Sequence, residues 1–179
     1  ELRSGELRLL FAALAIAVAA VTAVGFFADR VHLALEREAR QMMGGDLILV
    51  SDHALPDSYV SEVNHRGLLS AQTMIFPSMV IGPEQAQLAD IKAVSRNYPL
   101  RGRVEITVKA GASGAPTEGG PMPGTVWLDE RLSAALQVVP GGSVTVGAKV
   151  LTVAAILTRE PDRGVNFFSL APRLMMNLD

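Results

Sequence analysis

The residue types that most often carry chemistry are sparse in this sequence and poorly spaced for it. The three histidines, His32, His53 and His65, lie far apart, with neither the i,i+4 pairing nor the carboxylate spacing of a metal site. Cysteine is absent, which excludes disulfides, thiol chemistry and thiolate metal ligands. The sequence therefore predicts no metal site, and we expect the histidines at the surface.

Two further groups resemble catalytic patterns without matching them. Ser113 lies in GASGA, which differs from the G-x-S-x-G nucleophile elbow by one position, and the surrounding stretch is rich in Gly and Pro. A membrane-anchored hydrolase that uses Ser113 is therefore the weakest of three interpretations, after the two given at the end of this subsection. Asp129 and Glu130 are adjacent carboxylates, and the start of a predicted helix explains them. The chain also lacks a Walker-type Gly-x-x-x-x-Gly-Lys motif. We predict that this chain is not an enzyme and holds no cofactor.

The element that dominates the sequence is an apolar run over residues 9–27, nineteen residues without a charge. As a helix it would span roughly 28 Å, close to the hydrocarbon thickness of a bilayer, and no polar face can be drawn on it. A cleaved signal peptide is an alternative, but its apolar region would be roughly 7 to 15 residues long. We predict a transmembrane helix over 9–27, after a lead-in over 1–8 that is either amphipathic and interfacial or an ordinary solvated helix start.

Two patterns along this helix predict contacts. Small residues recur every fourth position in the membrane segment, a spacing that would let a second helix approach closely; they are Ala15, Ala19 and Ala23. Beyond the bilayer, a stalk helix over 28–43 has one apolar side among charged ones; that side holds Val31, Leu35, Ala39 and Met42. Gly44 and Gly45 then end the helix. The sequence predicts one rod, part membrane anchor and part stalk.

The remaining residues predict a mixed α+β domain in two parts. The first α+β subdomain, 44–110, contains a buried strand over 46–50, a helix over 56–66, and strands over 68–81, 87–95 and 103–110. A loop over 111–124, with five Gly and three Pro, is expected to be flexible. The second, β-rich subdomain, 125–179, contains a strand over 125–128, a helix capped by Asp129, strands over 143–146 and 150–157, and a polar turn over 158–164.

The ends and the charge of the chain add little about its function. Residues 165–179 are too apolar for a tail, so something must cover them, and the chain is expected to be an excerpt of a longer protein whose second subdomain is truncated. The net charge of −2 gives no reason to expect nucleic acid. Arginines flank the apolar run on both sides, so local charge does not decide its orientation.

Several blocks of sequence together resemble the N-terminal part of an ABC transporter permease of the FtsX-like/MacB type, in its YbbP-like branch. These blocks are GELRLLFAALAIAVAAVTAVGFFADRV at the helix, GGDLILVSD after the stalk, YPLRG at 98–102, VWLDERLSAAL leading to PGGSVTVGAKVLTVAAIL, and EPDRGVNFFSLAPRLMMNL near the end. The resemblance covers nearly the whole chain, and the helix, YPLRG and EPDRGVNFFSLAPR are its distinctive parts.

The resemblance implies a bacterial inner-membrane protein whose first helix starts in the cytoplasm and leads to a periplasmic domain of the MacB periplasmic-core type. It also implies further transmembrane helices, a separate cytoplasmic ABC ATPase subunit that binds ATP, membrane lipid around the helix, and a cargo that is a lipid, a hydrophobic compound or a periplasmic protein partner. We therefore expect a permease subunit that transmits ATP-driven motion through the stalk. The alternative is a single-pass membrane-anchored binding or adaptor domain without an ATPase.

Overall fold

The computed structural model of the chain describes residues 2–42, 44–109, 111–163 and 171–178, with the backbone alone for residues 2–4, 6 and 38–42. It forms two compact units, Glu1–Ala39 and Arg40–Asp179. Within these ranges the chain has three α-helices and eight β-strands. They are α1 (Leu2–Met42), α2 (Asp57–His65), β1 (Thr73–Ile81), β2 (Ala86–Val94), β3 (Val104–Thr107), β4 (Ala115–Thr117), β5 (Thr125–Asp129), α3 (Glu130–Leu136), β6 (Ser143–Val146), β7 (Lys149–Arg159) and β8 (Arg173–Asn177).

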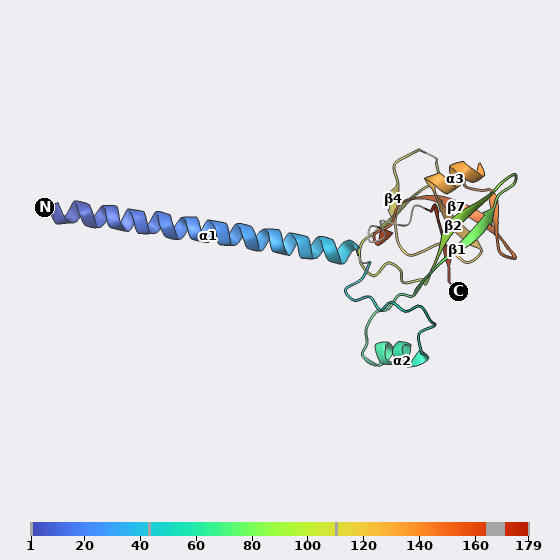
Figure 1. Cartoon of the computed structure of the whole chain (residues 1–179), viewed down its shortest axis with the longest axis horizontal. Coiled ribbons are helices and arrows are strands. Elements are labelled where there is room, and N and C mark those ends of the chain that lie inside the picture. The colour runs from blue at the N-terminus through green and yellow to red at the C-terminus, as the bar shows by residue number, and fades with distance from the viewer. Residues whose placement is uncertain (1, 43, 110, 164–170, 179) are drawn as a thin grey trace. The chain divides into compact units, whose positions relative to one another are not determined.

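Helix α1 is one unbroken helix of 41 residues (Figure 1). Its stretch Leu7–Arg37 is long and apolar enough to cross a membrane. Thr22 is the one polar side chain of the apolar run, and its Oγ1 donates a hydrogen bond to the Val18 carbonyl at 2.7 Å, so the hydroxyl has a partner inside the helix that lipid would not provide. The predicted continuous helix is confirmed, and it extends to Met42.

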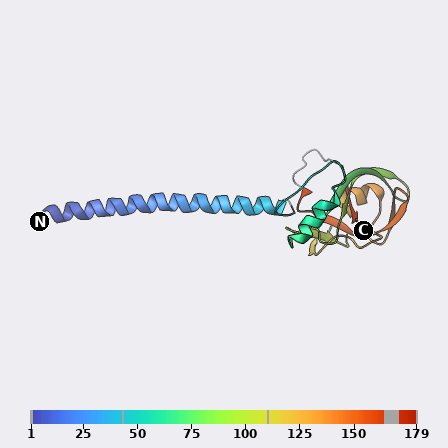
Figure 2. The same cartoon turned by 90° about the horizontal axis from the view of Figure 1, so that it is seen from below.

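The strands of the second unit close into a barrel. Their order is β4-β3-β7-β5-β8-β2-β1-β6, and β6 pairs back with β7, so six strands form a ring. The long strand β7 makes this closure possible, because residues 149–152 pair with β6 and residues 156–159 pair with β3. The β2–β8 and β5–β7 pairs are parallel and the others antiparallel. Figure 2 shows the green strands β1 and β2 curving over the orange helix α3.

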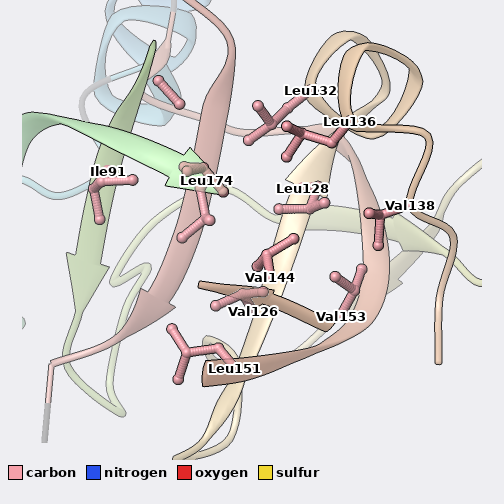
Figure 3. Close-up of a cluster of buried hydrophobic side chains, with 12 residues drawn as sticks. Ile91, Val126, Leu128, Leu132, Leu136, Val138, Val144, Leu151, Val153 and Leu174 are labelled. Carbon is pink, nitrogen blue, oxygen red and sulfur yellow. The ribbon is translucent and has the colours of Figure 1, made fainter. Parts of the chain in front are cut away.

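Helix α3 and the inward faces of the strands form the main hydrophobic core (Figure 3). Val126 and Leu128 alternate with Trp127 along β5, as the period of two in a strand requires, so they point inward and Trp127 does not. Leu132 and Leu136, at i and i+4, turn one face of α3 into the same core. The buried members are Val80, Ala89, Ile91, Val126, Leu128, Leu132, Leu136, Val138, Val144, Leu151, Val153 and Leu174.

A second apolar cluster lies on the opposite face of the central strands. Trp127 on β5 and Met175 on β8 are register partners, and both are covered. The cluster includes residues outside the barrel ring, from β3 and from the turn after β2. Its buried members are Val94, Tyr98, Val104, Trp127, Ala155, Leu157 and Met175.

Several predicted elements are confirmed close to their expected positions. Helix α2 falls within the predicted range 56–66, and Gly67 follows it with a φ of +64°, the left-handed conformation that favours glycine after a helix. Asp129 caps α3, and the β6–β7 hairpin turns at Gly147. The apolar end of the chain supplies β8, which is inserted between β5 and β2, whereas residues 164–170 and 179 lie outside the described residues.

The prediction of a buried strand over 46–50 is wrong. Residues 47–50 form no strand, and Leu47 and Val50 are 88% and 84% exposed. An uninterrupted apolar run indicates that burial is favourable, but it does not indicate which surface provides the cover. In the described part of the chain, no strand pairs with this run.

The division into two subdomains also differs from the structure. Strands of the predicted ranges 44–110 and 125–179 share one sheet, since β8 pairs with β2 and β7 pairs with β3. The predicted flexible loop 111–124 contributes β4, which pairs with β3. The reason is that β2 and β3 have edges that only strands from later in the sequence fill, and local sequence patterns do not encode such pairings.

Candidate functional site

The candidates for chemistry that the sequence offered do not assemble into a site. His32, His53 and His65 are exposed, as expected, and Ser113 is exposed in the loop before β4. Among the described residues, no group of three or more His, Asp or Glu side chains could hold a metal ion. The polar residues that the structure brings together are different ones, and most belong to the sequence blocks that carry the resemblance.

Asp129 links two of these blocks. Its Oδ1 accepts a hydrogen bond from the Leu132 backbone N–H at 2.8 Å, which caps α3. Its Oδ2 accepts a hydrogen bond from Arg163 Nη2 at 2.7 Å. Asp129 is 3% exposed and Glu130 is exposed, so the two adjacent carboxylates have different roles. The helix-start explanation is confirmed for both, since Asp129 is the N-cap and Glu130 the first residue of α3, and the structure adds the ion pair of Asp129 with the EPDR segment.

A buried polar cluster forms around Lys92, on the outward face of β2. Lys92 is 1% exposed, and its Nζ donates hydrogen bonds to Glu160 Oε1 at 2.5 Å, to Asp162 Oδ1 at 2.6 Å and to the Tyr98 hydroxyl at 2.8 Å. An ammonium group has three N–H donors, so each has a partner. The predicted polar turn over 158–164 is therefore corrected: β7 extends to Arg159, and Glu160 after it is buried. The turn is polar because it neutralises a buried lysine.

Tyr98 completes the hydrogen bonding of this buried polar cluster. Its hydroxyl accepts from Lys92 and donates to Asp162 Oδ1 at 2.6 Å. Burial, and then the negative charges of Asp162 and Glu160, raise the pKa of Tyr98 well above its ordinary value of 10.0. The phenol thus stays neutral and keeps donating its proton to Asp162. The tyrosine of the YPLRG turn is thus an internal hydrogen-bonding residue.

Arg173, the first residue of β8, is the second cation of the cluster. It is 5% exposed, and its Nε lies 3.5 Å from Glu160 Oε2. The cluster thus holds two cations, Lys92 and Arg173, against two carboxylates, Glu160 and Asp162. Such balance is what makes burial of charge tolerable, since an unpaired buried charge costs several kcal/mol. We define the buried polar cluster as Lys92, Tyr98, Glu160, Asp162 and Arg173.

The residues just after helix α1 are tied to the same region by a second set of contacts. The Arg101 backbone N–H donates to the Gly44 carbonyl at 2.9 Å, and Arg101 Nη2 donates to Asp46 Oδ2 at 2.8 Å. Gly44 has a φ of +68°, and a Cβ placed on it would lie 3.6 Å from Asp162 Oδ2. We call Gly44, Asp46 and Arg101 the exit clamp. It lies within the second unit and begins two residues after Met42, the last residue of α1.

Three of the sequence blocks that carry the resemblance therefore converge in space. GGD supplies Gly44 and Asp46, YPLRG supplies Tyr98 and Arg101, and EPDR supplies Glu160, Asp162 and Arg163. Residue-by-residue reasoning on the sequence missed this arrangement, because it examined each block for catalysis. Two signals could have revealed it: a lysine inside the apolar strand sequence ADIKAV, and three charged residues in a segment directly after a long strand.

The contacts predicted for residues of α1 stay predictions. Ala15, Ala19 and Ala23 line one shallow face of the helix together with Phe11, Leu14, Val18, Thr22 and Phe26. Val31 and Leu35 are 41% and 65% exposed. Ala39 and Met42 lie in the α1 backbone, and their side chains are outside the described residues.

Comparison with known proteins gives one informative relative. The chain is 36% identical over 178 residues, 99% of its length, to a protein of Escherichia coli strain K12 described as "Uncharacterized ABC transporter permease YbbP". The chain spans about a fifth, 21%, of that relative's length. No protein-family model matches the chain, and no solved structure gives a significant match. By sequence, this chain belongs with the ABC transporter permeases of the YbbP type.

Proposed function

We propose that this chain is the part of a permease subunit that connects a membrane-crossing helix to an extracytoplasmic barrel and transmits ATP-driven motion between them. In this proposal a separate cytoplasmic ABC ATPase binds and hydrolyses the ATP, and this chain binds none. The identity with a relative described as an ABC transporter permease supports the class of protein. The site residues support the mechanical role.

The observation that carries the mechanical role is the connection at the end of α1. The helix continues without a break from its apolar stretch to Met42, and a helix is stiff along its axis. The exit clamp starts at Gly44 and is joined through Arg101 and Tyr98, in one short turn, to the buried polar cluster. A force on the helix would thus reach residues fixed to the strands β2 and β8.

The test is to interrupt the helix between its apolar stretch and the exit clamp. Ala34→Gly with Leu35→Gly places two flexible residues in an exposed part of α1, at a cost in helix propensity of about 1 kcal/mol each relative to Ala. We expect the full-length permease to insert and to bind its ATPase, while cargo-dependent stimulation of ATP hydrolysis falls several-fold. The measurement is ATPase activity in proteoliposomes.

The matched control is the single substitution Leu35→Ala, which removes the same leucine side chain but keeps a strong helix former at this position. The control should keep its stimulation. If cargo stimulated ATP hydrolysis as strongly in the Gly-Gly variant as in the control, the proposed transmission of motion through α1 would be rejected.

The remaining parts of the proposal concern location and partners. We propose that α1 crosses the bacterial inner membrane with its N-terminus in the cytoplasm, and that the barrel handles a lipid, a hydrophobic compound or a protein on the periplasmic side. Purification of the full-length protein in mild detergent should bring down an ABC ATPase in a fixed ratio. A barrel that is purified alone, and that binds its ligand without any ATPase, would favour the anchored adaptor instead.

A further inference from the structure

The segment from 47 to 69, which we call the apolar arm, is the least covered part of the second unit. Every residue in it except Val63 is exposed, and α2 within it has no buried residue. Large apolar side chains are nevertheless concentrated there. They are Leu47, Ile48, Leu49, Val50, Leu55, Tyr59, Val60, Leu68 and Leu69, with exposed fractions from 36% to 88%.

The apolar arm is fixed to the barrel at its two ends. Before it, Asp46 is held by Arg101 of the exit clamp. After it, the Ser70 carbonyl accepts from Asn97 at 3.3 Å, and the Gln72 backbone N–H donates to Ser95 Oγ at 2.9 Å. The hydrogen bonds described inside the arm are local, such as Leu68 N–H to the Val63 carbonyl. Figure 1 shows the arm, with α2, as a loop beside the barrel strands.

Exposure of this many apolar side chains has a free-energy cost that a partner surface would remove. Burial of apolar area contributes about 25 cal/mol per Å², and contiguous exposed apolar patches are uncommon outside interaction sites. The positions of the fixed ends mean that the arm is presented at a defined place, next to the exit clamp. These features indicate a docking element.

The charges of the arm indicate the kind of partner. Residues 47–69 include three carboxylates, Asp52, Asp57 and Glu62, against the single guanidinium of Arg66. Anionic membrane surfaces attract basic segments, so this acidic segment fits a bilayer surface poorly. A second copy docking arm to arm would place like charges opposite each other. The remaining occupant is a protein surface that is apolar in its centre and basic at its rim.

We propose that the apolar arm docks onto another part of the same permease polypeptide, a surface with an apolar centre and a basic rim. This inference rests on the proposed function, which makes the chain one part of a longer permease, and on the relative of which the chain matches 21%. The docking places a second contact beside the exit clamp, so the segment that follows α1 is held by the barrel and by the rest of the permease.

The experiment measures the accessibility of single cysteines in the full-length permease, assembled with its ATPase in native membrane vesicles. The chain has no cysteine, so Val50→Cys and Leu69→Cys report on the arm, at positions 84% and 83% exposed. Met122→Cys and Val150→Cys are matched apolar controls, 77% and 71% exposed and outside the arm. Cysteines elsewhere in the polypeptide are replaced by serine, and labelling uses a membrane-impermeant maleimide on the side that the barrel faces.

We expect both arm positions to be labelled about tenfold more slowly than both controls, the population ratio that about 1.4 kcal/mol of docking free energy gives. Equal rates at arm and control positions would overturn the proposal. A photo-cross-linker that replaces Leu69 should then form a cross-link within the same polypeptide, so the product keeps the mass of a single chain. The segment that it captures should contain Lys or Arg. Adducts with lipid, with a second copy or with a separate protein would each overturn it.

The same vesicles separate this inference from the function on which it rests. Slow labelling at the arm without any associated ATPase would reject the proposed function and leave the docking intact. Fast labelling at the arm with a normally stimulated ATPase would reject the docking alone.

Discussion

Lys92 is a charged side chain in the buried C-terminal half of β2, between Ile91 and Ala93. Its burial is balanced by Glu160, Asp162 and Tyr98, all of which come from segments after strands. Taking an ammonium group out of water costs several kcal/mol, so the cluster is not a source of net stability in itself. Its effect is positional, because the YPLRG turn and the EPDR segment both supply hydrogen-bond partners to Lys92 and are thereby tied to β2.

Lys92→Met should destabilise the barrel by about 3–5 kcal/mol, because it removes one of the two cations that balance the buried carboxylate of Glu160 and the partly buried carboxylate of Asp162. The measurement is urea unfolding in detergent, followed by the fluorescence of Trp127, the single tryptophan, which is 6% exposed. Lys149→Met makes the same change at an exposed position and should stay within about 0.5 kcal/mol of the unmodified protein. Equal stabilities for the two variants would show that the cluster is not electrostatically coupled.

The neutral phenol of Tyr98 predicts a dependence on alkaline pH. Its pKa is raised in the folded state, so above about pH 10 the unfolded chain loses the Tyr98 proton while the folded chain keeps it. The unfolded state then binds fewer protons, and the free energy of unfolding falls with rising pH by up to about 1.4 kcal/mol per pH unit. This contribution is fully present below pH 10 and is lost progressively above it.

The measurement is a comparison of the unmodified protein with Tyr98→Phe at pH 8 to 11. At pH 8 the variant should be less stable by about 1–3 kcal/mol, because Lys92 and Asp162 each lose a hydrogen-bond partner. The difference should shrink as the pH rises past 10. Tyr59→Phe, at a half-exposed position on α2, should give no such trend. A constant difference across the range would contradict the buried neutral phenol.

At the scale of elements, helix α3 depends on one side chain for its start and its position. Asp129 caps the helix with Oδ1 and binds Arg163 with Oδ2, so it fixes the EPDR segment to the end of the barrel that α3 covers. Asp129→Ala should cost about 1–2 kcal/mol for the cap, plus the loss of the ion pair, in the Trp127 unfolding assay. Asp129→Asn keeps a capping oxygen but not the charge, so it should cost less. An Asn variant as unstable as the Ala variant would mean that the ion pair contributes more to stability than the cap does.

Elements with a local cause were predictable from the sequence. Helix α1 follows from its apolar run and helical continuation, α2 from Pro56 and Gly67, and the β6–β7 hairpin from Gly147. The ring closure was not, because it depends on β7 being long enough to pair with both β6 and β3 on one edge. The buried polar cluster was not either, because Lys92 is 68 residues away from Glu160 in the chain. The apolar run at 47–50 indicated burial, yet the described residues leave it exposed.

At the scale of the molecule, the barrel joins the chain on both sides of residues 111–124 into one structure. We predict that a protease site inserted between Ala112 and Ser113, in the loop before β4, can be cleaved without separating the two pieces. The pieces should stay together through the β2–β8 and β3–β7 pairs until the core unfolds. The measurement is size-exclusion chromatography of the cleaved protein in detergent, before and after urea. Separation in the absence of urea would contradict a single shared sheet.

The parallel pair of β2 and β8 has a consequence for biosynthesis. Asp90 and Arg173 are register partners although 83 residues separate them, and β8 lies between β2 and β5 in the ring. During translation α1 emerges first and β8, which closes the barrel, emerges last. Until then the edges of β2 and β5 are unpaired, for several seconds at a synthesis rate of about 5–20 residues per second. Open edges of this kind are where chains aggregate. A chaperone that shields nascent strands would therefore matter most for this domain between the emergence of β2 and the emergence of Asn177.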